Sequence, residues 1–136
     1  MKQVEGEAPM LDSLNITRMA EALADHSAAR LDLIARNVAQ ADTPGYKAMD
    51  LPDFADVYQD SAGDGMRATL PGHFTSAMTA MTPVPQPSGG EASPDGNTVS
   101  VEREMVKSAE VRQDHDMAMA VYQSARDILR ASLGLR

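Results

Sequence analysis

The sequence contains no cysteine and no tryptophan, and aromatic residues make up only 4% of its 136 residues. The absence of cysteine excludes disulfides, cysteine-ligated zinc, iron–sulfur clusters and a thiol nucleophile. Because aromatic side chains dominate the energetics of compact cores, their scarcity argues against a globule with one thick core. The apolar content is instead rich in Ala and in Met, of which there are ten. This composition favours long helices packed along seams.

Basic residues are also few, since 12 Lys and Arg stand against 20 Asp and Glu and give a formal net charge of −8. Nucleic-acid-binding proteins carry a basic patch or stripe, so we expect no nucleic-acid partner. No apolar run approaches the ~20 residues that a membrane-spanning helix needs. The first residues lack the basic start and apolar core of a cleaved signal peptide, so we expect any passage out of the cytoplasm to take another route.

Residues 14–42 form the first predicted helix, after a flexible segment over residues 1–13. Their apolar residues recur at steps of three and four, which places them on one face of a helix. Asp12 or Ser13 is the expected N-cap, and Pro44 prevents the helix from continuing. The seam residues that we single out are Leu31, Ile34 and Val38.

Residues 99–136 form the second predicted helix, with the same spacing of apolar residues. Ser100 is the expected N-cap, and Arg103 at the third helical position means that there is no capping box. The seam residues singled out here are Met105, Val111, Tyr122 and Leu129. The prediction is a mostly α protein whose two long amphipathic terminal helices form an antiparallel, coiled-coil-like hairpin.

The centre of the chain has a different composition. We predict a turn and extended segment over residues 43–60 and a flexible, irregular Gly/Pro-rich segment over residues 61–98, with a short hairpin near residues 66–75. A structureless stretch of this length is uncommon inside a compact domain. It is more typical of a linker or of a segment that a partner orders.

Few residues suggest chemistry. Neighbours on a helix point in different directions, so the run from Asp114 to Asp116 cannot converge on one metal ion, and His26 is expected on a polar helix face. We found no paired carboxylates and no phosphate-binding glycine loop. We therefore predict no catalytic residue, no cofactor, no metal and no small-molecule substrate, and not an enzyme. A small hydrolase that uses His73 with a nearby carboxylate is the weakest interpretation.

The run from Thr43 to Tyr46 predicts a type II turn, because Pro44 presets φ at its second position and Gly45 accepts the positive φ of the third. This turn ends the first helix and places Tyr46 beside its tip. Asn37 is a poor helix-interior residue and lies next to the seam. There it is expected to hydrogen-bond across a helix interface and fix the register.

Residues 35–48, with the sequence ARNVAQADTPGYKA, resemble the N-terminal signature of bacterial flagellar rod and hook proteins. The continuation over residues 50–54, Thr69 before the run over residues 71–73, and residues 95–105 are similar to the proximal-rod type. Arg36 and Gln40 depart from the residues usual in the family. The signature residues expected at a subunit interface are Asn37, Ala41, Asp42, Thr43, Pro44, Gly45, Tyr46 and Lys47.

The resemblance implies a structural subunit of the proximal rod of the flagellar basal body, which stacks helically and transmits torque. Its implied partners are other copies of itself, related rod proteins, inner-membrane ring and rod-base adaptor proteins, and the flagellar type III export apparatus. The implied location is the periplasmic rod, reached without a cleaved signal peptide. Because one pair of helices leaves apolar faces uncovered, we expect neighbouring subunits to complete the fold. The alternative is a small helical export chaperone or adaptor that binds a flagellar partner in the cytoplasm.

Overall fold

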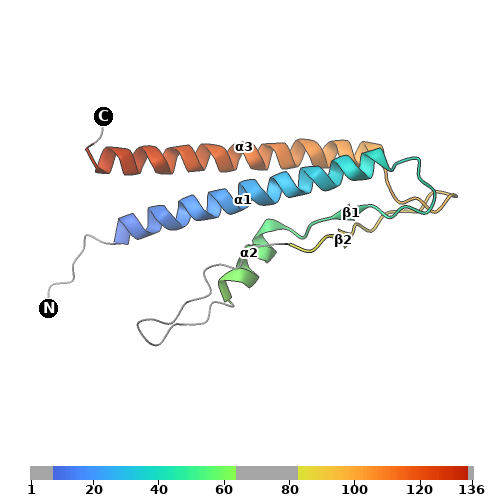
Figure 1. Ribbon diagram of the computed structural model, residues 1–136, viewed down its shortest axis with the longest axis horizontal. Helices are drawn as coiled ribbons and strands as arrows, with labels where there is room; N and C mark the ends of the chain where they lie inside the picture. Colours follow the sequence, from blue (N-terminus) through green and yellow to red (C-terminus); the bar gives the residue numbers. More distant parts are fainter. Residues whose placement is uncertain (1–7, 64–82, 135–136) are drawn as a thin grey trace. The chain divides into compact units, whose positions relative to one another are not determined.

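A computed structural model of the protein describes residues 8–63 and 83–134. In chain order its elements are α1 (Ala8–Ala39), β1 (Met49–Asp50), α2 (Phe54–Gly63), β2 (Gln86–Pro87) and α3 (Val101–Ser132) (Figure 1). The predicted mostly α class, with long N- and C-terminal helices, is confirmed. Over the described residues, none of the helices combines the length and the apolar character needed to cross a membrane.

Helix α1 begins at Ala8, six residues before the predicted start at residue 14. Pro9 is compatible with this early start, because the N–H that it lacks would have no partner in a first helical turn. The expected caps Asp12 and Ser13 therefore lie inside the helix. At its other end α1 stops at Ala39, before the predicted end at residue 42.

Helix α3 begins at Val101, two residues inside the predicted segment 99–136 and directly after the predicted N-cap. The backbone N–H of Arg103 donates to Oγ of Ser100 over 3.4 Å, which confirms Ser100 as the N-cap. The helix ends at Ser132 rather than continuing to residue 136. Gly134 then adopts a φ of +69°, a conformation that terminates helices and that glycine adopts without strain.

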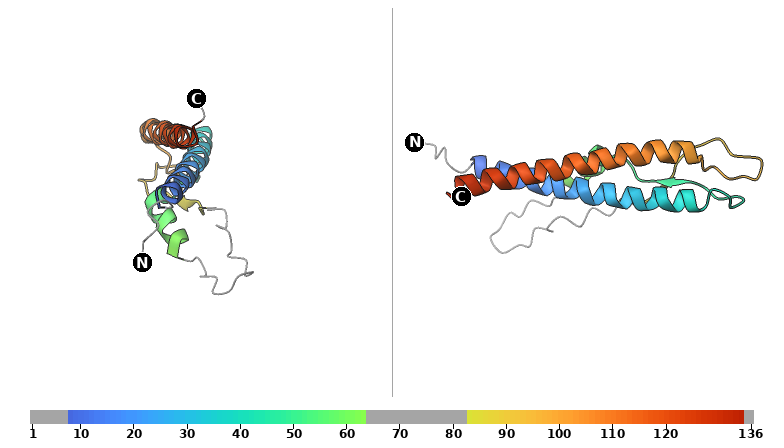
Figure 2. Two further views of the ribbon diagram at one scale, coloured as in Figure 1. Left: turned by 90° about the vertical axis from the view of Figure 1, so that its left-hand side faces the viewer. Right: turned by 90° about the horizontal axis from the view of Figure 1, so that it is seen from above.

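The chain divides into two compact units, and both long helices contribute to each of them. Unit 1 combines α1 as far as Leu31 with α3 from Met105 onward, and unit 2 runs from Asp32 to Glu104. In unit 1 the two helical segments lie side by side (Figures 1 and 2). The side chains buried in unit 1 are mostly small: Ala20, His26, Ser27, Val111, Ala118 and Ala125.

Two of the predicted seam residues are exposed instead, namely Val38 (38% exposed) and Met105 (63%). Their neighbours Asn37 and Glu104 are buried, with exposures of 0% and 2%. Successive residues of a helix point about 100° apart. The prediction therefore placed an apolar residue on the seam at these two positions, whereas the buried residue is its polar neighbour. His26, expected on a polar face, is also buried.

The other predicted seam residues do face inward. Ile34 and Val111 are buried, and the partly buried ones are Leu31, Tyr122 and Leu129. Along α3 the buried residues recur every seven positions, at Glu104, Val111, Ala118 and Ala125. A seven-residue spacing is the repeat of coiled-coil seams.

Unit 2 contains structure that the sequence analysis did not predict. Strands β1 and β2 pair antiparallel, with Met49 opposite Pro87 and Asp50 opposite Gln86. Residues 83–98 thus depart from the flexible segment expected there. The expected hairpin over residues 66–75, together with His73, lies outside the described residues.

Helix α2 occupies part of the segment predicted to be extended. It follows Pro52, and the carbonyl of Asp53 accepts the N–H of Val57 over 3.2 Å. The rings of Phe54 and Tyr58, one helical turn apart, lie 5.4 Å from each other. A helix of ten residues is too short for its period to stand out in the sequence.

Candidate functional site

The turn after α1 has the predicted geometry. Gly45 has a φ of +73°, and the N–H of Tyr46 donates to the carbonyl of Thr43 over 3.3 Å. These are the marks of a type II turn with glycine at its third position, so the prediction is confirmed. A side chain at position 45 would meet no atom within 4 Å, so the backbone conformation alone favours glycine here.

Asn37 uses every hydrogen-bonding position of its carboxamide. Its Nδ2 donates to the carbonyl of Met49 over 2.8 Å and to Oε2 of Glu104 over 2.9 Å. Its Oδ1 accepts from the backbone N–H of Met49 over 3.0 Å and from the hydroxyl of Tyr46 over 3.3 Å. Two donors and two acceptors are all that an Asn side chain offers. This one buried residue therefore joins α1, β1 and the start of α3, and the predicted bond across a helix interface is confirmed.

Asn97 makes the second such junction and is 2% exposed. Its Nδ2 lies 2.8–2.9 Å from three backbone carbonyls, those of Gln40, Ala41 and Thr43. Its Oδ1 accepts the N–H of Val99 over 2.7 Å. These three carbonyls belong to the turn that follows α1, so the side chain of Asn97 holds this turn against the segment that precedes α3.

The chain after the turn is bonded to the segment around Asn97. The N–H of Gly45 donates to the backbone carbonyl of Asp95 over 3.0 Å, and the N–H of Thr98 donates to the backbone carbonyl of Tyr46 over 3.0 Å. Nζ of Lys47 donates to the carbonyl of Gly96 over 2.9 Å. The sites built by Asn37 and Asn97 therefore form one bonded region, which we call the tip network: residues 37–49 and 95–104.

The tip network brings most of the signature residues together. Asn37, Thr43, Gly45, Tyr46 and Lys47 all take part in its hydrogen bonds, and Ala41 contributes a carbonyl. Asp42 and Pro44 lie exposed. The seam residues Val111, Tyr122 and Leu129 belong to unit 1 and are no part of it.

Sequence reasoning missed Asn97 and Glu104 as site residues. A signal was present for each. Asp95-Gly96 is a strong turn signal directly before Asn97, and Glu104 stands seven residues before the predicted seam residue Val111. Both signals were passed over because the first fell in a segment expected to be flexible and the second belongs to a charged residue.

The electrostatics of the tip network are those of a closed structural site. In the described part of the chain, every buried side-chain nitrogen and oxygen has a hydrogen-bond partner, and no three acidic or histidine side chains are grouped as a metal site would need.

Glu102 is exposed at the start of α3. Hydrogen bonds from its own backbone and from Ser100 lower the pKa of its carboxyl group from the usual 4.5.

The fold and this site define a mostly helical structural protein, built around a bonded turn that carries the flagellar rod and hook signature. No protein-family model matches the chain. A flagellar basal body rod protein FlgB of Escherichia coli is 32% identical over 126 residues, which cover 82% of this chain and 88% of that protein. The corresponding protein of Salmonella typhimurium is 30% identical over 127 residues (82% and 88%), and that of Agrobacterium fabrum 26% over 121 residues (84% and 89%). The chain belongs to the FlgB family of flagellar basal body rod proteins.

Proposed function

We propose that this protein is a structural subunit of the proximal rod of the bacterial flagellar basal body, where it stacks helically with other subunits and transmits torque. The observation that carries the proposal is the tip network, because the signature of rod and hook proteins coincides with a fully bonded turn. Such a network suits a mechanical element. Its buried polar groups satisfy one another and specify one arrangement of the chain.

We infer that the two terminal helices work as an antiparallel, coiled-coil-like hairpin. The seven-residue recurrence of buried residues on α3 supports this arrangement. The buried side chains of unit 1 are mostly small, so the seam alone contributes little apolar burial. We therefore expect the isolated chain to be partly unfolded and neighbouring subunits to complete its helices.

The surface of α3 supports assembly with other chains. Several large apolar side chains on it are more than half exposed, namely Met105, Val106, Met117 and Ile128. Exposed apolar side chains such as these are available for contacts with other chains. The proposed partners are further copies of this chain, related rod proteins, ring and rod-base adaptor proteins, and the type III export apparatus that would deliver it, without a cleaved signal peptide, to the periplasmic rod.

The exposed part of the signature is the proposed contact with a neighbouring subunit. Asp42 and Pro44 are exposed. Buried Asn37, through its hydrogen bonds, and Gly45, through its positive φ, instead hold the shape on which these two are presented.

Fractionation of cells that make the tagged full-length chain tests the proposal. Detergent-extracted basal bodies should contain the chain, and immunoelectron microscopy should place it at the base of the rod. Cells that make the untagged chain are the control. Recovery only from the soluble fraction would contradict the proposal and favour the export chaperone or adaptor.

A further inference from the structure

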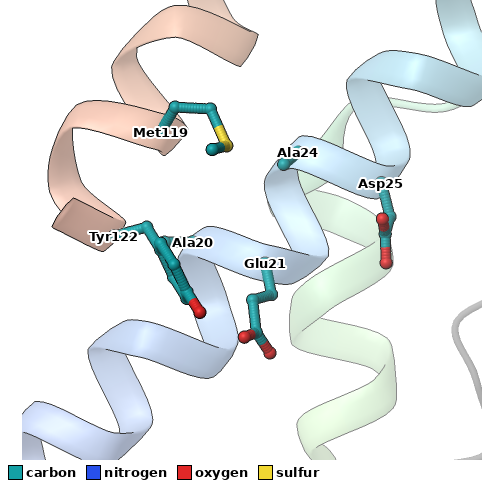
Figure 3. Close-up of a pocket in the computed structure, with 6 residues that line it drawn as sticks. All are labelled: Ala20, Glu21, Ala24, Asp25, Met119 and Tyr122. Carbon is teal, nitrogen blue, oxygen red and sulfur yellow. The ribbon is translucent and has the colours of Figure 1, made fainter. Parts of the chain in front are cut away.

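A hollow of about 350 Å³ lies on the surface of unit 1, between α1 and α3 (Figure 3). Its residues come in three kinds: two small ones, two carboxylates and two long side chains of α3. They are Ala20, Ala24, Glu21, Asp25, Met119 and Tyr122. The volume is at the lower end of the ~300–1,000 Å³ range of small-molecule pockets. Because Glu21, Asp25 and Met119 are exposed, the hollow suits one inserted side chain better than an enclosed ligand.

The acidic side of the hollow is formed by two carboxylates of α1. Glu21 and Asp25 are one helical turn apart, a spacing at which like charges repel. Within the described ranges 8–63 and 83–134, neither carboxylate is paired with a basic side chain. The opposite side is apolar and aromatic, since Figure 3 shows Met119 and Tyr122 reaching from α3 toward α1.

A long cationic side chain satisfies both sides at once. Arg and Lys lay their aliphatic stems along apolar surface and keep the charged group at its edge. The stem would contact Met119 and the two alanines, while the cation would bond to the carboxylates. The ring of Tyr122 already has a cation near it, because Cζ of Arg126 lies 5.8 Å from its centroid.

We propose that this hollow receives an Arg or Lys side chain from a helix of a different, more basic protein in the assembly. This inference rests on the proposed function. A second copy of this chain is the less favourable source of the cation, because each copy has a net charge of −8, and the proposed contacts between copies would use other surfaces of the chain. Two of its basic side chains are also engaged within the chain, Arg36 with Asp32 over 2.7 Å and Lys47 with Gly96.

Site-specific cross-linking in assembled basal bodies tests the proposal. A photoreactive phenylalanine replaces Met119 in the full-length chain, and mass spectrometry identifies the cross-linked peptide. The matched control carries the same probe at Ile128, which is exposed on α3 outside the hollow. The expected product joins position 119 to a different protein, within about one helical turn of an Arg or Lys. A cross-link to a second copy, to a segment without a basic residue, or to nothing overturns the inference.

The contribution of the carboxylates is tested in the same assay. The double variant Glu21→Gln, Asp25→Asn should lower the yield of that cross-link roughly three- to tenfold, as the loss of two exposed ion pairs predicts. The control double variant Glu110→Gln, Asp127→Asn removes the same charge from exposed positions outside the hollow and should leave the yield unchanged. Equal yields for the two double variants overturn the inference. A chain that is found in basal bodies but gives no such product refutes this inference alone, whereas a chain absent from them refutes the proposed function too.

Discussion

Asn37 on α1 donates a hydrogen bond to Glu104 on α3 over 2.9 Å, and the two residues are 67 positions apart in the sequence. Both side chains are buried, at helix positions where a seam residue is expected. A shift of one helix along the other by a turn would separate the carboxylate from its donor. Because the loss of a donor to a buried carboxylate is costly, this bond favours one register of the two helix ends.

The variant Asn37→Leu should lower the free energy of unfolding by about 2–4 kcal/mol, because it leaves the buried carboxylate of Glu104 without this donor. The change is measured as the loss of amide-exchange protection over residues 37–49 and 95–104 of the full-length chain. Val38→Ala, at the exposed neighbouring position, should change stability by less than about 0.5 kcal/mol. Equal effects of the two variants would show that Asn37 has no special role.

Replacing Asn97 should open the turn after α1. Asn97→Ala removes one donor from each of three carbonyls, and we expect a loss of about 1–3 kcal/mol and faster amide exchange over residues 40–46. Asn97→Asp keeps the acceptor for the N–H of Val99 but places a negative charge against these three carbonyl oxygens. It should therefore be at least as damaging as Ala. An aspartate variant as stable as the native chain would contradict the assigned role of the amide donors.

Gly45→Val should impair assembly and motility, because a β-branched residue at a φ of +73° is strained. Gly45→Asn should be much milder, since Asn tolerates this conformation and the site has room for a side chain. Gly89→Ala is the matched control, because position 89 also has open space and no positive φ. Swarming diameter and rod recovery measure the effect. A fully motile Gly45→Val strain would remove the turn from the list of assembly determinants.

The start of α3 should weaken in acid because of Glu102. Its pKa is lowered in the folded chain by hydrogen bonds from its own backbone and from Ser100, so its stabilising effect is fully present above pH 4.5 and is lost as the pH falls through the folded value. Helicity measured against pH should therefore decline less below pH 4.5 for Glu102→Gln than for the native chain. Identical curves for the two proteins would contradict this account.

The features that the sequence predicted correctly depend on a few neighbouring residues. The type II turn at Pro44 and Gly45 and the N-cap at Ser100 follow from local φ preferences and hydrogen bonds. The long helices follow from a spacing repeated over many turns. Such signals need no knowledge of distant parts of the chain.

The features that were missed depend on contacts across the sequence. Glu104 reads as a solvated charge until Asn37 is placed beside it, and Asn97 reads as part of a flexible loop until the end of α1 is placed beside it. Val38 and Met105 were assigned to the seam in their place, because apolar character is the only measure of burial that a sequence offers. Polar residues buried in pairs are invisible to that measure.

The role of Asn97 has a consequence for the order of folding. The carbonyls that it binds belong to residues 54–57 positions earlier in the chain. Contacts this distant form late, because the intervening loop must first close. A chain that leaves a ribosome with its N-terminus first therefore cannot close the turn after α1 onto Asn97 until its first 97 residues are free.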